Sequence, residues 1–272
     1  MKPSFKKLRF LILLFLALSL TFIAIAGPAL APQNPNTIDL EKSYTLPGRE
    51  HILGTDRLGR DIFSRLLVGA RNSFALTVAM VLIVACIGSA IGMFSGFVGG
   101  AVDSVIMQVA DTLLAFPSMV FVIAIVGIWG SGIYRTVLTL GVVCWAKYAR
   151  LAQGLVTEIR RSEYVTVARF GGSRWYRILG KYVMPNILPP IVIAATLDIG
   201  EMMITLSALS FLGLVGQPPT PEWGNMLANS RALVTVVPHL VLYPALAILI
   251  TVVVFNLLGD SLRDILDPRE TK

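Results

Sequence analysis

The sequence predicts an all-α, polytopic membrane protein with six transmembrane helices. Hydrophobic residues make up 55% of the 272 positions and charged residues only 14%, whereas a soluble domain has about 25% charged residues. The mean hydropathy is +0.75. A chain this apolar stays folded when lipid is its solvent. Helices suit that solvent because they satisfy their backbone hydrogen bonds internally.

Six apolar stretches account for the predicted spans, since a helix needs about 20 residues to cross the hydrocarbon core. They run over residues 10–30, 73–98, 105–129, 136–148, 187–212 and 236–258. The first follows four basic residues and ends near Ala29-Leu30-Ala31, which is also the layout of a cleaved secretory signal. Its length and the later spans favour an uncleaved anchor. The fourth is short, and we expect its helix to continue through Arg150 into the cytoplasm.

The Lys and Arg residues set the predicted orientation. Fifteen of the 23 lie in the N-terminal tail, between Lys147 and Lys181, or in the C-terminal tail. Because cytoplasmic segments carry an excess of Lys and Arg, we expect both termini of this multi-pass membrane protein to be cytoplasmic. Nucleic-acid binding is not expected, since it needs a basic patch on a water-exposed fold.

The spans divide the chain into five predicted segments. They are a cytoplasmic tail (1–9), a first anchor (10–30), an extracytoplasmic loop (31–72), a core of five helices (73–258) with a cytoplasmic loop at about 158–185, and a cytoplasmic C-terminal tail (259–272).

Motifs for catalysis or metal binding are missing from the sequence. Cys86 and Cys144 lie within apolar runs, which excludes a disulfide framework or a paired-cysteine metal motif. His51 and His239 are remote in sequence, and no GxxxxGK[ST] phosphate loop occurs. We therefore predict no enzyme activity, no catalytic or metal-ligating residues and no bound cofactor.

Glycines recur every four residues along the second predicted span, at Gly88, Gly92, Gly96 and Gly100. Lipid provides no hydrophobic drive for helix association, so membrane helices rely on small residues that let backbones approach closely. The ladder predicts a helix-packing face.

The extracytoplasmic loop contains a charged segment from Leu53 to Arg65. Thr55 or Asp56 is predicted to cap a following helix. We expect that helix to lie at the membrane surface with its charged face in water.

The cytoplasmic loop predicts a helix–glycine–helix elbow. Residues 163–170 have helical potential, Gly171-Gly172 interrupts the helix, and a second helix is expected from Arg174 to Val183, ending at Met184-Pro185. The apolar side chains on the first helix need either a partner groove or the bilayer headgroups.

A second unusual segment follows the fifth span, over residues 210–224. Its three prolines within four residues cannot continue a helix, and irregular backbone at the membrane edge is tolerated where it lines a cavity or is buried in protein. Four residues are predicted to gate or line the outer mouth of a path: Pro218, Pro219, Glu222 and Trp223.

Two carboxylates lie within the fifth span, at Asp198 and Glu201. They are three residues apart and therefore share a helix face. Intramembrane carboxylates are costly and mark functional sites by default. They are predicted to line a translocation path, with a polar clamp between helices as the alternative.

At these loops the chain resembles the inner-membrane permeases of binding-protein-dependent ABC importers for dipeptides, oligopeptides and nickel. The most specific strings are LGTDRLGRDIFSRL, SFLGLVGQPPTPEWGNML and FNLLGDSLRDILDP. The elbow is similar to the family's coupling loop, E-A-A-x3-G-x9-I-x-L-P, when aligned on Gly172 and Pro185. Thr166 replaces the acidic residue of that pattern, and Tyr182 and Met184 replace its Ile and Leu.

The resemblance implies a permease that works with a second permease subunit, two ATPase subunits that use ATP, and an extracytoplasmic solute-binding protein. Contact with the ATPase would involve the elbow residues Tyr164, Val165, Ala168, Phe170, Gly171, Gly172 and Pro185.

The stretch Ala195–Met203 resembles nickel-type more than peptide-type permeases, so nickel or a metal chelate is the predicted substrate, with di- or oligopeptides as the alternative. An ion-coupled secondary transporter would also have six or more spans and buried carboxylates. Such folds usually contain inverted repeats, and no convincing internal repeat is visible.

Overall fold

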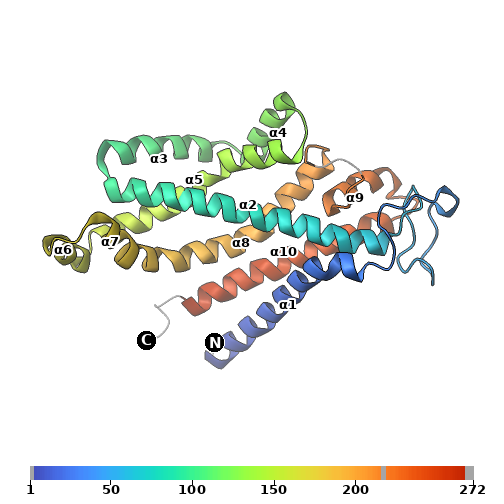
Figure 1. Cartoon of the computed structure of the whole chain (residues 1–272), viewed down its shortest axis with the longest axis horizontal. Coiled ribbons are helices and arrows are strands. Elements are labelled where there is room, and N and C mark those ends of the chain that lie inside the picture. Colours follow the sequence, from blue (N-terminus) through green and yellow to red (C-terminus); the bar gives the residue numbers. More distant parts are fainter. Residues whose placement is uncertain (1–2, 216–218, 267–272) are drawn as a thin grey trace.

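The computed structural model describes residues 3–215 and 219–266, and long helices dominate this part of the chain. They lie along one another in an elongated bundle (Figure 1). The long helices are α1 (Pro3–Leu30), α2 (Ile62–Val98), α5 (Ile133–Arg160), α8 (Met184–Phe211) and α10 (His239–Leu266). Among the described residues, all of these except α5 are long and apolar enough to cross a membrane. The chain is an all-helical membrane protein.

The predicted third span is not one straight helix. It consists of α3 (Gly100–Ala115) and α4 (Ser118–Trp129), which meet at an angle of 89°. Phe116 is extended, with φ −101° and ψ 144°, because a residue that precedes proline is pushed out of the helical region. Pro117 therefore sets the break. If this bent pair counts as one crossing, the described chain has five candidate spans.

Helix α2 begins at Ile62, eleven residues before the predicted start at Ser73. Arg65 and Arg71 lower the hydropathy of its first turns, which hid them from a search for apolar stretches. Arg65 is nevertheless buried, and its Nη1 donates a hydrogen bond to the carbonyl of Pro35 at 2.8 Å. The folded loop before α2 thus shelters a charge that composition alone assigns to solvent.

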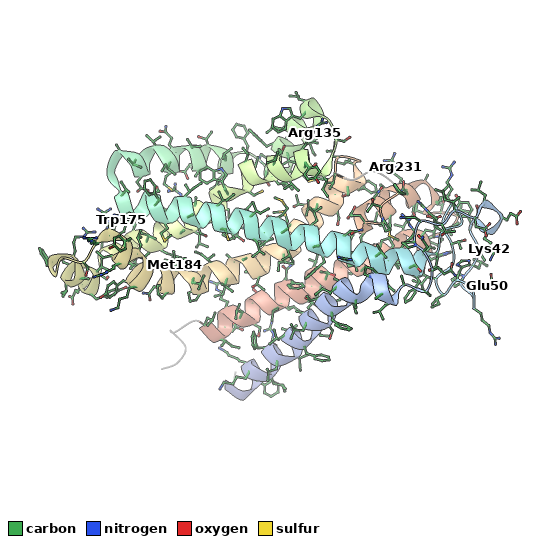
Figure 2. The ribbon with its side chains drawn as sticks, viewed as in Figure 1. Lys42, Glu50, Arg135, Trp175, Met184 and Arg231 are labelled. Carbon is green, nitrogen blue, oxygen red and sulfur yellow. The ribbon has the colours of Figure 1, made fainter. Side chains whose placement is uncertain are left out.

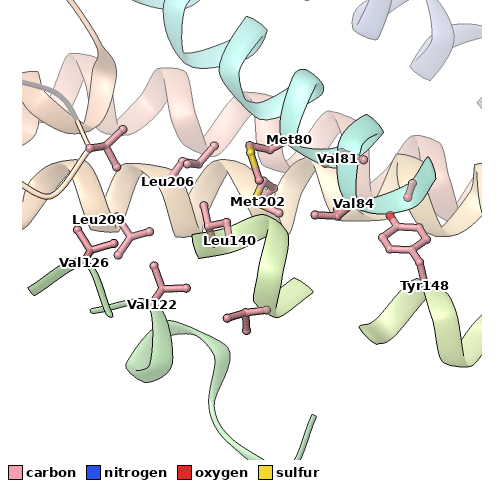
Figure 3. Close-up of a cluster of buried hydrophobic side chains, with 13 residues drawn as sticks. Met80, Val81, Val84, Val122, Val126, Leu140, Tyr148, Met202, Leu206 and Leu209 are labelled. Carbon is pink, nitrogen blue, oxygen red and sulfur yellow. The ribbon is translucent and has the colours of Figure 1, made fainter. Parts of the chain in front are cut away.

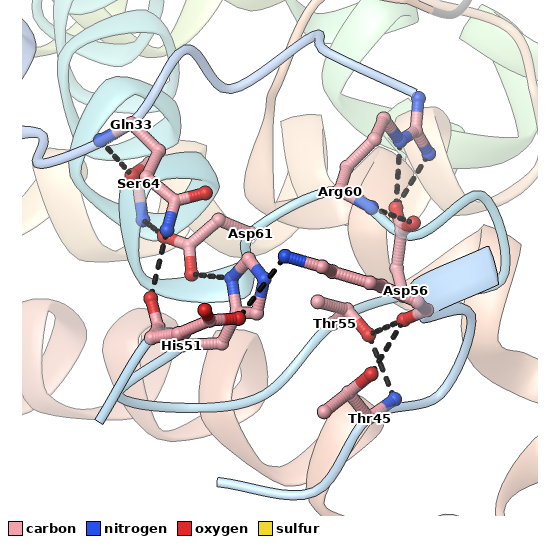
Figure 4. A network of polar contacts seen from close by, with 10 residues as sticks. Gln33, Thr45, His51, Thr55, Asp56, Arg60, Asp61 and Ser64 are labelled. Atoms are coloured by element: carbon pink, nitrogen blue, oxygen red, sulfur yellow. Dashed lines mark hydrogen bonds and ion pairs between the residues drawn. The ribbon is translucent and has the colours of Figure 1, made fainter. Parts of the chain in front are cut away.

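Asp61 caps α2, and the predicted caps Thr55 and Asp56 are wrong. The Asp61 carboxylate accepts the backbone N–H of Ser64 at 2.8 Å (Figure 4). Asp56 instead accepts backbone N–H groups inside its own turn, including that of Leu58 at 2.8 Å. The predicted surface helix is absent from this described segment, because residues 53–61 fold as turns and α2 runs directly into the bundle.

The glycine ladder packs α2 against α5. A Cβ at Gly92 would lie 2.1 Å from the Ala149 carbonyl oxygen, and Gly88 and Gly96 also face the α5 backbone closely. The packing prediction is confirmed for these three. It is wrong for Gly100, which starts α3 and has open space where a Cβ would lie.

The helix that contains the fourth apolar stretch, α5, continues past Arg150 to Arg160, and its predicted continuation through Arg150 is confirmed. After the elbow, the chain forms α7 (Trp175–Ile178), a π-helical turn η2 (Leu179–Val183) and then α8 without interruption. The predicted end at Met184-Pro185 is wrong. In the π turn, the N–H of Met184 bonds to the carbonyl of Leu179, and this wider turn accommodates Pro185, which has no N–H to donate.

The core lies where α2, α4, α5 and α8 meet (Figure 3). Its largest members include Met80, Leu140, Tyr148, Met202 and Leu209. A second cluster joins α1 to α10, and α1 turns large apolar side chains such as Phe15 and Phe22 outward. Outward apolar faces are expected for helices that contact lipid. Retention of α1 as an anchor stays a prediction.

The two ends of the bundle carry different structures. The elbow, with Trp175 and Met184, lies at one end, and the loop with Lys42 and Glu50 lies at the other (Figure 2). The Lys42 ammonium donates to Glu50 Oε2 at 3.0 Å. This hydrogen bond raises the pKa of Lys42 and lowers the pKa of Glu50.

Candidate functional site

A cluster of three charges lies between α5 and α8. The Lys147 ammonium is 2.6 Å from Asp198 Oδ1 and 2.9 Å from Glu201 Oε2. Asp198 and Glu201 share a face of α8, as their spacing predicted, and Lys147 is the partner that sequence reasoning missed. The cluster carries two negative charges and one positive charge.

The three members differ in exposure. The Asp198 side chain is only 12% exposed, whereas Lys147 is 51% and Glu201 69% exposed. Asp198 is therefore the inner anchor of the cluster, and the other two present one charge of each sign on the open side. A cavity of about 180 Å³ lies next to them, and Leu114, Phe116 and other residues around the α3–α4 break also line it.

The cluster is the first part of a polar stripe along α5. Lys147, Arg150 and Gln153 follow at intervals of three residues, and this spacing places them on one helix face. Arg150 pairs with Asp111 of α3, and Gln153 Nε2 donates to Asp103 Oδ2 of α3 at 2.9 Å. Every polar head of the stripe thus has a partner on a neighbouring helix.

The stripe borders open space as well as helices. A second cavity, of about 700 Å³, is lined by Asp103, Asp111, Arg150 and Gln153. Further along α5, Arg160 Nη1 reaches the Gly96 carbonyl oxygen at 3.4 Å. Polar groups therefore continue from the ion cluster toward the elbow end of the bundle. Buried polar groups in a membrane helix normally face the bundle interior or a water-filled path.

These residues hold no ready-made metal centre. Across residues 3–215 and 219–266, no group of three or more His, Cys, Asp or Glu side chains lies close enough to share a metal ion. What the ion cluster can do chemically is to attract, orient and release a charged solute.

The elbow has a defined backbone geometry. Helix α6 (Glu163–Phe170) ends at Gly171, and Gly172 follows with φ +76°. The N–H of Ser173 bonds to the Ala168 carbonyl at 3.1 Å, and the N–H of Gly172 bonds to the Arg169 carbonyl at 3.1 Å. These two bonds and the left-handed glycine make a Schellman motif. The predicted glycine interruption is confirmed.

The side chains of α6 divide into an inner and an outer set. Val165 is 1% exposed and packs with Ile178 and other buried side chains of α5 and α8, so it needs no outside partner, contrary to the prediction. Phe170, in contrast, is 88% exposed, and Val167 and Tyr164 are exposed too. Ala168 is partly buried, and Pro185 is exposed. The elbow is thus anchored by Val165 and presents Phe170 outward.

The segment at the other end of the bundle leads into α9 (Trp223–Ser230). Glu222 caps this helix by accepting the N–H of Asn225 at 2.8 Å, and it also accepts the Ser73 hydroxyl of α2 at 3.1 Å. The Trp223 indole donates to the Leu66 carbonyl at 3.1 Å. Both residues therefore fasten α9 to α2. Their role at an outer mouth stays a prediction.

The two prolines predicted with them have separate outcomes. Pro219 is exposed before α9, and Pro218 lies outside the described residues. The gating role of both stays a prediction.

Comparisons with known proteins identify the family. Residues 88–272, more than half of the chain, match the model described as "Binding-protein-dependent transport system inner membrane component". The chain is 39% identical to the nickel transport system permease protein NikC of Escherichia coli K12 over 258 residues, which is 95% of this chain and 93% of that protein.

Two further relatives carry other names. The probable D,D-dipeptide transport system permease protein DdpC of Escherichia coli K12 is 40% identical over 246 residues, 90% of this chain and 82% of that protein. The glutathione transport system permease protein GsiD of Pectobacterium atrosepticum is 41% identical over 234 residues, 86% of this chain and 78% of that protein. The three levels of identity do not separate the three substrates.

Membership in this family excludes the ion-coupled secondary transporter considered as an alternative. The chain is not a catalytic subunit, and its family works with ATPase and binding-protein partners. It belongs to the inner-membrane permease components of binding-protein-dependent ABC importers.

Proposed function

We propose that the chain forms one half of the translocation path of an ATP-driven importer, and that the cluster of Lys147, Asp198 and Glu201 lines this path. The observation that carries the proposal is the pairing of Lys147 with both carboxylates beside a cavity. Charges inside a membrane protein are expensive and are kept where a solute or ion must pass. The other half of the path would come from a second permease subunit.

The proposal includes six crossings with both termini in the cytoplasm. Helix α5 is less apolar than the other long helices because of its polar stripe, yet its first turn is tied to the segment that follows α8: the Thr136 hydroxyl donates to the Leu214 carbonyl at 2.9 Å. Arg9 of α1 lies 3.9 Å from Asp264 of α10, and the N and C ends of the chain lie together, away from the loop before α2 (Figure 1). Since the start of α1 and the end of α10 lie together, the chain crosses the membrane an even number of times, and six crossings with α5 included meet this condition. The positive-inside rule assigns the side of the two termini to the cytoplasm.

The elbow is proposed to couple the path to ATP hydrolysis. Its exposed Phe170 would enter a groove on an ATPase subunit, with Tyr164, Ala168, Gly171, Gly172 and Pro185 around the contact and Val165 as its internal anchor. Two ATPase subunits below and a solute-binding protein above would complete the importer. Pro218, Pro219, Glu222 and Trp223 are proposed to lie near the outer mouth.

Two substrate classes follow from the charges of the cluster. The net negative charge suits nickel as a cationic chelate or hydrated ion, as the sequence predicted. Lys147 favours the second class, di- or oligopeptides, because the exposed pair of Lys147 and Glu201 offers one charge of each sign to a zwitterion. The geometry therefore supports a small peptide better than a bare cation.

Uptake by the reconstituted importer tests this choice. Proteoliposomes would contain wild type, Lys147→Gln or the charge-preserving control Lys147→Arg, and uptake of a labelled dipeptide and of labelled nickel chelate would be measured. We expect Lys147→Gln to lower dipeptide uptake about tenfold, as one lost charge contact implies, with Lys147→Arg near wild type. If Lys147→Gln instead leaves dipeptide uptake unchanged and raises nickel uptake, the metal assignment replaces the peptide one.

A further inference from the structure

A cavity at the loop end of the bundle is lined by arginines that the transport path does not use. It has a volume of about 270 Å³ and lies between the loop before α2 and the segment from α9 through η3 (Arg231–Leu233) to α10. Its polar lining comes from Arg57, Arg60, Arg65, Asn229 and Ser230, next to the carboxylate of Asp56.

Two of these arginines are almost completely buried. Arg60 is 6% and Arg65 3% exposed. Both share one carboxylate: Arg60 Nη2 is 2.7 Å and Arg65 Nε 3.7 Å from Asp56 Oδ2 (the Arg60 contact is drawn in Figure 4). Arg57, which also borders the cavity, has no ion-pair partner among the described residues. The three guanidinium groups and one carboxylate leave two positive charges.

The buried carboxylate of Asp61 does not cancel this surplus. Asp61 accepts the N–H of Ser64 at the start of α2 and lies 3.0 Å from His51 Nδ1, and it is not part of the cavity lining (Figure 4). A buried charge without a counter-charge is strongly destabilising. One surplus charge is enclosed, since the buried Arg60 and Arg65 share one carboxylate, and the other is carried by the exposed Arg57 at the border. The cavity therefore calls for an anion from outside the chain.

We propose that this cavity binds an oxyanion, the phosphate group of a lipid headgroup or free phosphate. A guanidinium presents its N–H donors in a planar fork that matches phosphate oxygens. The Asn229 amide and Ser230 hydroxyl provide further donors, and the apolar walls formed by Ile62, Met226 and Leu240 strengthen electrostatic attraction by lowering the local dielectric. The cavity is smaller than the roughly 300–1,000 Å³ of pockets for drug-sized ligands, so it fits a single phosphate group.

Thermal unfolding of the full-length chain, purified in detergent with its co-purifying subunits, tests the site. Sodium phosphate replaces sodium chloride at constant ionic strength, and the midpoint is followed by tryptophan fluorescence. The test variant is Arg57→Gln, whose exposed side chain borders the cavity. The matched control is Arg49→Gln, which removes the same charge from an exposed position of the same loop outside the cavity. Each protein is measured before and after delipidation.

We expect the unfolding midpoint of the wild type to rise saturably with phosphate. In Arg57→Gln the half-maximal rise should need about tenfold more phosphate, which is the effect of one lost charge-assisted contact. In Arg49→Gln the phosphate concentration for the half-maximal rise should equal that of the wild type. A response only after delipidation identifies a lipid headgroup as the resident ligand, and an equal response in both preparations identifies free phosphate. The proposal is overturned if neither preparation responds saturably, or if Arg57→Gln and Arg49→Gln respond alike.

Discussion

The Lys147 ammonium of α5 lies 2.6 Å from the Asp198 carboxylate of α8, so an ion pair joins two helices across 51 positions of sequence. Removal of Lys147 leaves two carboxylates without their counter-ion, and removal of Asp198 leaves Lys147 with only the exposed Glu201. We expect Lys147→Met and Asp198→Leu each to destabilise the protein by about 1–3 kcal/mol, less than for a fully buried pair because Lys147 is half exposed.

The double variant Lys147→Met with Asp198→Leu should recover part of that loss, because it removes both charges together. Thermal unfolding in detergent gives the comparison, and Arg135→Met, at an exposed position near the start of α5, is the control for loss of one charge. Additive losses in the double variant would show that the two residues do not stabilise each other.

Topology is tested by accessibility. In a chain whose Cys86 and Cys144 are replaced, a single Cys at Ser173 should react with a membrane-impermeant thiol reagent only from the cytoplasmic side. A Cys at the exposed position Asn36 should react only from outside. The reason is the excess of Lys and Arg around the elbow. Reversed labelling would contradict the orientation.

The glycine packing between α2 and α5 predicts a selective effect of one methyl group. Gly92→Ala would bring its Cβ to 2.1 Å from the Ala149 backbone oxygen and force the helices apart, whereas Gly141→Ala on α5 meets open space. Overpacking of this kind costs about 1–3 kcal/mol. We expect a lower unfolding midpoint for Gly92→Ala and an unchanged or higher one for Gly141→Ala. Equal midpoints would argue against close packing at Gly92.

The elbow offers a matched pair of adjacent glycines. Gly172 has φ +76°, where a side chain costs about 1–2 kcal/mol, while Gly171 has φ −70°. Gly172→Ala should therefore weaken binding of the ATPase subunits by about tenfold, and Gly171→Ala should not. Co-purification and ATPase stimulation measure the effect, with membrane insertion checked by the labelling assay above. Unimpaired docking of Gly172→Ala would remove the elbow geometry from the coupling mechanism.

Local features of the fold could be predicted from the sequence. The all-helical class, the α2 glycine ladder, the Gly171-Gly172 interruption and the extension of α5 past Arg150 follow from composition or short spacing. The predicted span boundaries are wrong where contacts between residues far apart in the sequence determine them. Arg65 lies in the first turn of α2 because the Asp56 carboxylate and the Pro35 carbonyl interact with its guanidinium. Hydropathy does not reveal such partners.

The sequence predicts two of the three charged residues of the candidate site. Asp198 and Glu201 stood out as charges in an apolar span, and their three-residue spacing gave their common face. The sequence groups Lys147 with the cytoplasmic basic residues, because it lies at the end of a short apolar stretch and begins the Lys- and Arg-rich segment. One signal could have found it: Lys147, Arg150 and Gln153 are spaced by three residues, and positions three apart are neighbours on one helix face. Their partners on α3 and α8 required the tertiary structure.

The central claim is that the charge of Asp198 serves transport and does not merely fasten α5 to α8. The most direct measurement is uptake by the reconstituted importer carrying Asp198→Asn, which keeps the side-chain shape and an oxygen acceptor for Lys147 but removes the charge. We predict at least about tenfold lower uptake, with assembly and ATPase activity preserved. Normal uptake by Asp198→Asn together with failed assembly of Asp198→Leu would contradict the claim and leave Asp198 as a structural clamp.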